Sequence, residues 1–221
     1  MKLLLETLCK FAAGVAAVTL LVFLPAGTLR YPGGWLMLGV LFLPMAAFGI
    51  LLYRKAPQLL RRRLQGRERS AIQKRAVGFS GLLFLAVFVL SGLDYRFGWS
   101  HLPLLAQGAA AAVFLGGYAL YGVVLFYNEW LSRTVVVEQG QQLVDSGPYA
   151  VVRHPMYLAT VLMFCTLPLV LGSVWAFALQ LGYPLLLVGR IRDEEQLLHR
   201  ELAGYTDYCQ RVKYRMVPYI W

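Results

Sequence analysis

The sequence predicts an all-α integral membrane protein with four transmembrane helices, a C-terminal broken helical hairpin and a cytoplasmic amphipathic tail. Of its 221 residues, 59% are hydrophobic, and the mean hydropathy of +0.60 exceeds that of most soluble chains. Four apolar runs match the length of about 20 residues with which a helix crosses a hydrocarbon core: 8–29, 34–53, 76–93 and 102–127. Each run should be helical, because a bilayer offers no hydrogen-bond partners to an open backbone.

The first apolar run follows a basic flank of Lys2 and Lys10, an arrangement that also occurs in cleaved signal peptides. The run extends from Phe11 to Leu24 and beyond, which is longer than most signal-peptide cores, and no clear small-x-small cleavage site follows it. An uncleaved first span is therefore favoured.

The segment between the second and third runs is the most charged part of the chain, with Arg54, Lys55, Arg61, Arg62, Arg63, Arg67, Arg69, Lys74 and Arg75. The positive-inside rule makes it a cytoplasmic loop. Both termini are then cytoplasmic, and only Arg30 and Arg96 of the 21 Lys and Arg lie on the far side. Attraction to anionic membrane lipids is the simpler role for this loop, and specific capture of an acidic lipid or substrate is the alternative. The expected location is a bacterial or archaeal cell membrane.

Small residues recur every four positions in the fourth run, at Gly108, Ala112 and Gly116. This spacing places them on one helical face, which predicts a close approach to a neighbouring helix.

A polar segment and then an apolar segment follow the fourth run. Residues 128–153 form a polar segment with turn residues at Asp145–Pro148, whereas Met156–Gly189 is apolar, too long for one simple span, and interrupted by Pro168, Gly172, Gly182 and Pro184. A helical hairpin that enters the membrane and returns to the cytoplasm is predicted. The tail from Arg190 to Trp221 carries aromatic residues typical of a membrane interface, namely Tyr205, Tyr208, Tyr214, Tyr219 and Trp221. We divide the chain into an N-terminal helix pair with its basic loop (1–75) and a core (76–221).

Nucleic-acid binding and a structural metal are both disfavoured by the composition. The basic residues interrupt apolar runs and do not line an aromatic-studded polar surface. The cysteines, Cys9, Cys165 and Cys209, form no CxxC or Cys/His pattern and are interpreted as reduced packing residues.

Two polar clusters flank the predicted hairpin, so its two ends should bring them together. The first lies within residues 147–157 and the second begins at Arg190. Ionisable groups gathered where burial is expensive indicate a functional site. Taken singly, Arg153 and Arg190 are also explained by snorkelling to headgroups, and Glu194 and Glu195 by charges at the start of a helix that they open.

These clusters resemble the signature of the isoprenylcysteine carboxyl methyltransferase family, which is grouped with phospholipid and small-thiol methyltransferases of membranes. The matching residues occur in order, with nearly the family's spacing, over the last third of the chain: Leu143-Val144, Gly147-Pro148-Tyr149, Arg153-His154-Pro155-Met156-Tyr157, Arg190, Glu194-Glu195, Leu198, Gly204-Tyr205, Tyr208 and Val212. There is no GxGxxG motif after a strand, which excludes a soluble Rossmann-type methyltransferase.

The resemblance implies a cytoplasmic pocket for S-adenosyl-L-methionine. The residues it assigns to this cofactor are Gln141, Gln142, Leu143, Val144, Tyr149, His154, Pro155, Met156, Tyr157 and Glu194. It implies that Arg190 contacts the substrate and that Arg153 lies near the reacting groups, so the catalytic residues would be Arg153, Arg190 and Glu194.

The residue types suit methyl transfer. A carboxylate such as Glu194 can pair with the cofactor's ammonium group, and Arg153 or Arg190 can hold a substrate carboxylate by two hydrogen bonds. An amine or thiol substrate would instead need a base, for which the candidates are Glu195, His154 or a tyrosine.

The chain departs from the prenylcysteine enzymes at two loop positions. Gln141 stands where the family has His, and Val137 stands where the family has Gln further upstream. Side-chain contacts at these positions, and the identity of the substrate, therefore do not follow from the resemblance.

We expect methylation of a lipophilic or lipidated substrate that reaches the site laterally from the membrane lipids, with carboxyl O-methylation as the lead hypothesis. Phospholipid N-methylation, small-thiol S-methylation and, in a different class, a non-catalytic transporter whose broken hairpin lines a path are the alternatives. The oligomeric state stays open.

Overall fold

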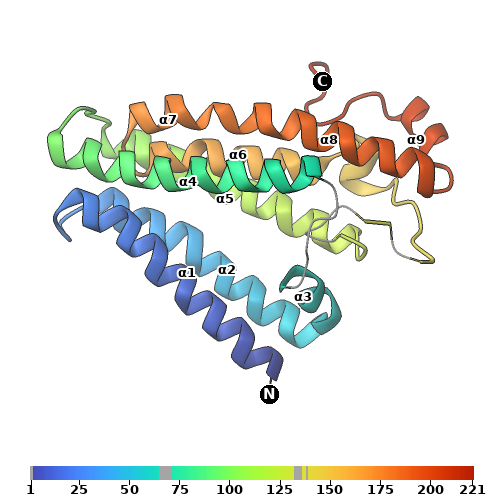
Figure 1. Cartoon of the computed structure of the whole chain (residues 1–221), viewed down its shortest axis with the longest axis horizontal. Helices are drawn as coiled ribbons and strands as arrows, with labels where there is room; N and C mark the ends of the chain where they lie inside the picture. Colours follow the sequence, from blue (N-terminus) through green and yellow to red (C-terminus); the bar gives the residue numbers. More distant parts are fainter. Residues whose placement is uncertain (1, 65–70, 132–135, 138) are drawn as a thin grey trace.

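The structure, a computed structural model, describes residues 2–64, 71–131, 136–137 and 139–221. In these ranges the chain forms nine α-helices and one 3-10 helix, with no strand, as predicted for an all-α protein. Arg67 and Arg69 of the basic segment lie outside the described residues. The elements (Figure 1) are α1 (Lys2–Ala26), α2 (Pro32–Lys55), α3 (Pro57–Leu64), α4 (Ala71–Phe97), α5 (Leu104–Tyr127), η1 (Gly147–Ala150), α6 (Pro155–Val170), α7 (Val174–Gln180), α8 (Gly182–Glu201) and α9 (Tyr205–Arg211).

Five segments in the described part of the chain are long and apolar enough to cross a membrane: Leu3–Ala26, Pro32–Lys55, Gln73–Phe97, Leu104–Tyr127 and Val174–Glu201. The first four coincide with the four predicted runs, and the fifth contains α7 and α8. The protein is an integral membrane protein. The short α6 is apolar but shorter than a full span.

The helices form a wedge that is closed at one end. α4, α5, α6 and the α7–α8 arm pack together, and α1 packs on α4 while α2 packs on α5. Figure 1 shows the α1–α2 pair meeting this bundle near the turns 27–31 and 98–103 and diverging from it toward the N-terminus. We call the end with these turns the far end, and the end that carries α3, η1 and α9 the site end.

The helix α3 occupies part of the basic segment that was predicted to be a loop. Its Leu59 and Leu60 are buried, whereas Arg61 is exposed. Leu59 and Leu60 thus give this helix an apolar contact with the protein, while Arg61 faces outward.

The prediction for the small residues of the fourth run is wrong within this chain. Gly108, Ala112 and Gly116 are all exposed. Close packing occurs instead at Gly117, where an added Cβ would lie 2.8 Å from the Met163 Cγ atom and 3.0 Å from the Ala159 carbonyl oxygen of α6. The four-residue spacing identified a face of small residues but not the direction in which that face points.

The chain turns back after α6 and continues as the α7–α8 arm, which runs antiparallel to α6 (Figure 1). Gly172 makes the turn with a φ of 83°, and the Ser173 side chain caps α7 by accepting the Ala176 N–H. Pro168 stays inside α6, while Leu181 separates α7 from α8. Because the arms run antiparallel, the residues before α6 meet the middle of α8 at the site end.

Candidate functional site

A cavity of about 1200 Å³ occupies the wedge and reaches the site end. Its inner part is lined by apolar side chains of α1, α2, α4, α5 and α6, among them Phe11, Phe48 and Phe84. Its outer part is lined by polar residues from the segment before α6 and from α8. One cavity therefore joins an apolar chamber within the membrane-spanning helices to a polar chamber at the site end.

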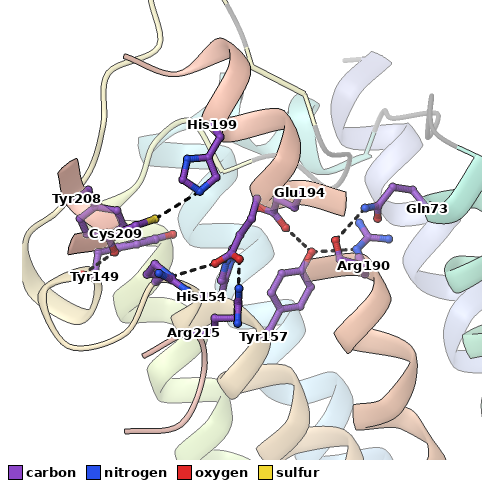
Figure 2. Close-up of polar contacts among 12 residues, drawn as sticks. Gln73, Tyr149, His154, Tyr157, Arg190, Glu194, His199, Tyr208, Cys209 and Arg215 are labelled. Atoms are coloured by element: carbon purple, nitrogen blue, oxygen red, sulfur yellow. Dashed lines mark hydrogen bonds and ion pairs between the residues drawn. The ribbon is translucent and has the colours of Figure 1, made fainter. Parts of the chain in front are cut away.

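The hydroxyl of Tyr157 connects the two polar clusters that the sequence predicted to meet. It donates a hydrogen bond to Glu194 Oε2 at 2.6 Å and accepts one from Arg190 Nε at 3.0 Å. Figure 2 shows Tyr157 between these two side chains of α8. From α4, the buried Gln73 donates to the Arg190 carbonyl oxygen at 3.1 Å and to Asp193 Oδ2 at 2.8 Å, which holds this part of α8 against the bundle.

Glu195, next to Glu194, is a buried ion-pair centre. Its Oε1 atom lies 3.0 Å from Arg153 Nε and 3.3 Å from His154 Nε2, and its Oε2 atom accepts a hydrogen bond from Arg215 Nε at 2.7 Å. A carboxylate that is 6% exposed needs such partners to offset the loss of water. Glu195 is not among the residues that line the cavity, so its predicted alternative role as a base has no access to a ligand there.

The positions of the four charged residues bear on the alternative, purely structural interpretations of them. Glu194 and Glu195 lie in the second half of α8 and do not open a helix, so the macrodipole explanation is wrong. The Arg153 side chain is 9% exposed and paired with Glu195, so it does not snorkel to headgroups. Arg190 is held by Tyr157 at the cavity wall.

The loop side of the polar chamber is fixed around Tyr149. Asn128 Nδ2 donates to the Tyr149 hydroxyl at 2.9 Å, and the Tyr208 hydroxyl donates to the Tyr149 carbonyl oxygen at 2.7 Å. Tyr205 and Tyr208 are 3% and 1% exposed and line the cavity. The prediction that these two aromatics lie at the membrane interface is therefore wrong, whereas Tyr219 is 88% exposed.

Burial raises the pKa of Tyr205 well above its ordinary value, and the neighbouring Glu195 carboxylate adds to this shift. Burial likewise raises the pKa of Tyr208. Both hydroxyls consequently stay protonated near neutral pH, so they are poor candidates for a general base.

The structure brings nearly all the predicted site residues together. Those that line the cavity are Gln141, Gln142, Leu143, Val144, Tyr149, Arg153, His154, Met156, Tyr157, Arg190 and Glu194. Pro155 does not line it but forms the buried first turn of α6. Val137 packs against the Tyr205 and Tyr208 cluster, and the neighbouring Val136 lines the cavity instead.

Three further residues contribute to the site that the sequence pattern did not indicate, namely Gln73, Asn128 and Arg215. Each makes its site contact with a residue distant in sequence. No local motif marks them, because their roles arise from which helices pack together.

The comparisons with known proteins bear on the same segment. Residues 109–200 match the model of the isoprenylcysteine carboxyl methyltransferase family. This match confirms the family resemblance, and it covers the arms that carry Arg153, His154, Tyr157, Arg190 and Glu194. It leaves α1 to α4 outside.

Two curated relatives are similar over part of the chain. A Mus musculus protein named Delta(14)-sterol reductase TM7SF2 is 37% identical over 92 residues, which cover 40% of this chain and 22% of that protein. The nickel-cobalt-cadmium resistance protein NccN of Alcaligenes xylosoxydans xylosoxydans is 31% identical over 87 residues, which cover 37% of this chain and 39% of that protein. The chain thus spans well under half of the length of these relatives.

Proposed function

We propose that the protein is a membrane methyltransferase that moves a methyl group from S-adenosyl-L-methionine to a lipophilic substrate. The observation that carries this proposal is the single cavity whose polar chamber is built from the family segment and whose inner chamber is apolar. A volume of about 1200 Å³ exceeds that of most pockets for one drug-sized ligand. Two ligands, one polar and one apolar, account for both its size and its two-part lining.

The polar chamber has the groups that such a cofactor needs. When bound, the cofactor supplies an electrophilic methyl group on a sulfonium. Glu194 provides a carboxylate for its ammonium, and the ring and hydroxyl groups of His154, Tyr149 and Tyr157 provide hydrogen-bond partners. Leu143, Val144 and Met156 give apolar contact area and keep water away from the reacting atoms.

The charges along the cavity favour a substrate with an anionic group. Lys10, Arg54, Arg153 and Arg190 line it, whereas Glu194 is the acidic residue in the same lining. A carboxylate held by Arg190 or Arg153 needs no general base, because it is already a nucleophile. This supports carboxyl O-methylation over N-methylation of a phospholipid or S-methylation of a small thiol.

The arrangement of the helices supports lateral access to the site from the lipid. α1 and α2 diverge from the bundle toward the site end (Figure 1), and exposed apolar residues such as Leu8 and Ile50 line the cavity. We further propose a topology of four full spans plus the α6 and α7–α8 hairpin, with the site end and both termini cytoplasmic. Arg30 and Arg96 then lie at the far end, as the positive-inside rule requires.

Calorimetry on the purified protein in detergent tests the cofactor assignment. S-adenosylhomocysteine should bind with one site per chain, because it retains the amino acid and adenosine groups that the polar chamber recognises. A parallel titration with NADPH addresses a reductase function, which the name of one relative raises. Binding of NADPH without binding of S-adenosylhomocysteine would overturn the methyltransferase proposal, and binding of neither would favour a transporter.

A labelled-methyl transfer assay then identifies the acceptor. Prenylated cysteine carboxylates, phospholipids with amine headgroups and small thiols are offered separately in the same detergent. We expect transfer to the lipophilic carboxylate, as an ester that base hydrolyses. Transfer to an amine or thiol alone would retain the enzyme class and reject carboxyl methylation.

A further inference from the structure

The segment after α9, residues Val212–Trp221, packs behind the site, and we call it the C-terminal strap. The Tyr214 and Arg215 carbonyl oxygens accept the backbone N–H groups of Arg153 and His154 at 2.9 and 2.7 Å. Met216 is buried against Tyr183, Leu187 and Ile191. The strap thereby fixes the backbone of the two residues that precede α6.

The strap also acts on the same two residues through side chains. Arg215 Nε donates to Glu195 Oε2 at 2.7 Å, and the other oxygen of that carboxylate contacts Arg153 and His154. The Arg215 guanidinium lies 5.5 Å from the centre of the Trp221 ring. The main-chain oxygen of Trp221 in turn accepts the N–H groups of Met216 and Val217. Figure 2 shows His154 and Arg215 close together.

Two of these residues face the cavity, and two lie behind them. Arg153 and His154 line the cavity, whereas Glu195 and Arg215 do not. Arg215 is therefore placed to influence the cavity wall only through Glu195 and the strap backbone. Its side chain is 34% exposed, so its bond to Glu195 forms at the outer edge of the buried pair.

We propose that Arg215 is a positioning residue that, through Glu195, holds Arg153 and His154 in the orientation needed for methyl transfer. This inference rests on the proposed function. Without Arg215, Glu195 Oε2 loses its partner, and the carboxylate can rotate toward Arg153 and His154 and draw both side chains from the cavity wall. The strap lies outside the segment that matches the family model, so the match assigns no role to it.

The competing explanation is that the strap only adds stability, for example by placing Tyr214 and Tyr219 at the membrane interface. The two explanations differ in how substitutions combine. If Arg215 acts through Glu195, removing it should have little further effect once Glu195 is neutralised. If it only stabilises the fold, the effects of the two substitutions should multiply.

The test compares Arg215→Ala, Arg215→Lys, Glu195→Gln and the double variant Glu195→Gln/Arg215→Ala in the labelled-methyl assay. We expect Arg215→Ala to lower kcat about tenfold or more, because the charge-assisted hydrogen bond to Glu195 is lost. KM should be nearly unchanged, because neither Arg215 nor Glu195 lines the cavity. Arg215→Lys should restore most of kcat, and the double variant should be no slower than Glu195→Gln. Arg211→Ala is the control, since Arg211 is an exposed arginine near the strap that pairs with Asp145 at 2.8 Å.

Multiplicative losses in the double variant, or unchanged kcat in Arg215→Ala, would overturn the proposal. Hydrogen exchange supplies a readout that does not depend on activity. Peptides covering residues 151–157 should exchange faster in Arg215→Ala than in the parent, while peptides from the far-end turns should not change. A parent protein without methyl transfer would reject the proposed function, and unchanged exchange in residues 151–157 would separately reject the positioning role.

Discussion

Each end of the protein contains a buried carboxylate, and the two are satisfied by different chemistry. At the far end, Asp94 is 1% exposed and accepts hydrogen bonds from the Ser100 N–H and hydroxyl, each at 2.7 Å, and from the Ser173 hydroxyl. At the site end, Glu195 is 6% exposed and contacts Arg153, His154 and Arg215. Uncharged hydroxyl and backbone N–H donors surround Asp94, whereas two arginines and a histidine surround Glu195.

The two sets of partners indicate that the far end stabilises the fold and that the site end is arranged for ligands. The partners of Asp94 do not line the cavity, and together they tie the end of α4 to the turn between α6 and α7. Tyr31 supports the same junction by donating to the Leu171 carbonyl oxygen at 2.5 Å. By contrast, Arg153 and His154 contact Glu195 and also line the cavity. Glu195 therefore holds an arginine and a histidine at the cavity wall, whereas the partners of Asp94 are uncharged groups that join helices.

Replacing Asp94 should produce the largest effect, and it should be an effect on stability. Asp94→Ala leaves the donors on Ser100 and Ser173 without their acceptor, which costs about 3 kcal/mol of unfolding free energy. Thermal unfolding in detergent measures this loss. S-adenosylhomocysteine affinity at low temperature should equal that of the parent, because none of these groups lines the cavity.

Glu201→Ala is the matched control for Asp94→Ala, since it removes an exposed carboxylate at the end of α8. Its unfolding midpoint should match the parent's. If Asp94→Ala instead unfolds normally and loses ligand affinity, the division of the molecule into a structural end and a ligand end is wrong.

Hydropathy predicted the long helices well and their ends poorly. The four apolar runs became α1, α2, α4 and α5, because crossing a bilayer imposes a length and a composition that the sequence records. Asp94 directly follows the predicted third run, 76–93, but lies inside α4. Asp94 pairs with Ser173, which lies in the turn between α6 and α7, and no local sequence pattern records such a pairing.

The same contrast holds at the site. The meeting of Tyr157 with Arg190 and Glu194 followed from the hairpin, since a chain that turns back must bring its flanks together. The different orientations of the two adjacent acids could not be predicted from the hairpin: Glu194 faces the cavity and Glu195 faces the strap. Successive residues on a helix point about 100° apart, and which one faces a ligand depends on how the helix is rotated against its neighbours.

Arg190→Ala should produce the next largest effect. Unlike Asp94→Ala, it should lower turnover and leave stability unchanged. We expect methyl transfer to fall about 100-fold, as for other single charged contacts to reacting groups, with S-adenosylhomocysteine affinity largely kept. Arg192→Ala, two residues away on the exposed side of α8, is the control and should behave as the parent. Equal turnover in Arg190→Ala and Arg192→Ala would remove Arg190 from the substrate site.

Glu194→Ala should weaken S-adenosylhomocysteine about 30-fold, because a charge-assisted contact with the ligand's ammonium is lost. The exposed acid in Glu201→Ala again provides the control, and calorimetry provides the measurement. Circular dichroism and gel filtration establish that the variant is folded. Unchanged affinity in a folded Glu194→Ala protein would show that the cofactor pocket is assigned to the wrong residues.

Tyr157→Phe should have the smallest effect of the set, because it removes one hydroxyl and keeps the ring. This hydroxyl links Glu194 to Arg190, so its loss should both weaken S-adenosylhomocysteine and slow transfer, each by about fivefold. Tyr219→Phe, at an exposed position of the strap, should change neither quantity. A change in transfer alone would mean that Tyr157 serves Arg190 and not Glu194, and a change in affinity alone would mean the reverse. The two halves of the polar chamber would then act independently, whereas a joint change supports one hydrogen-bonded unit that positions cofactor and substrate together.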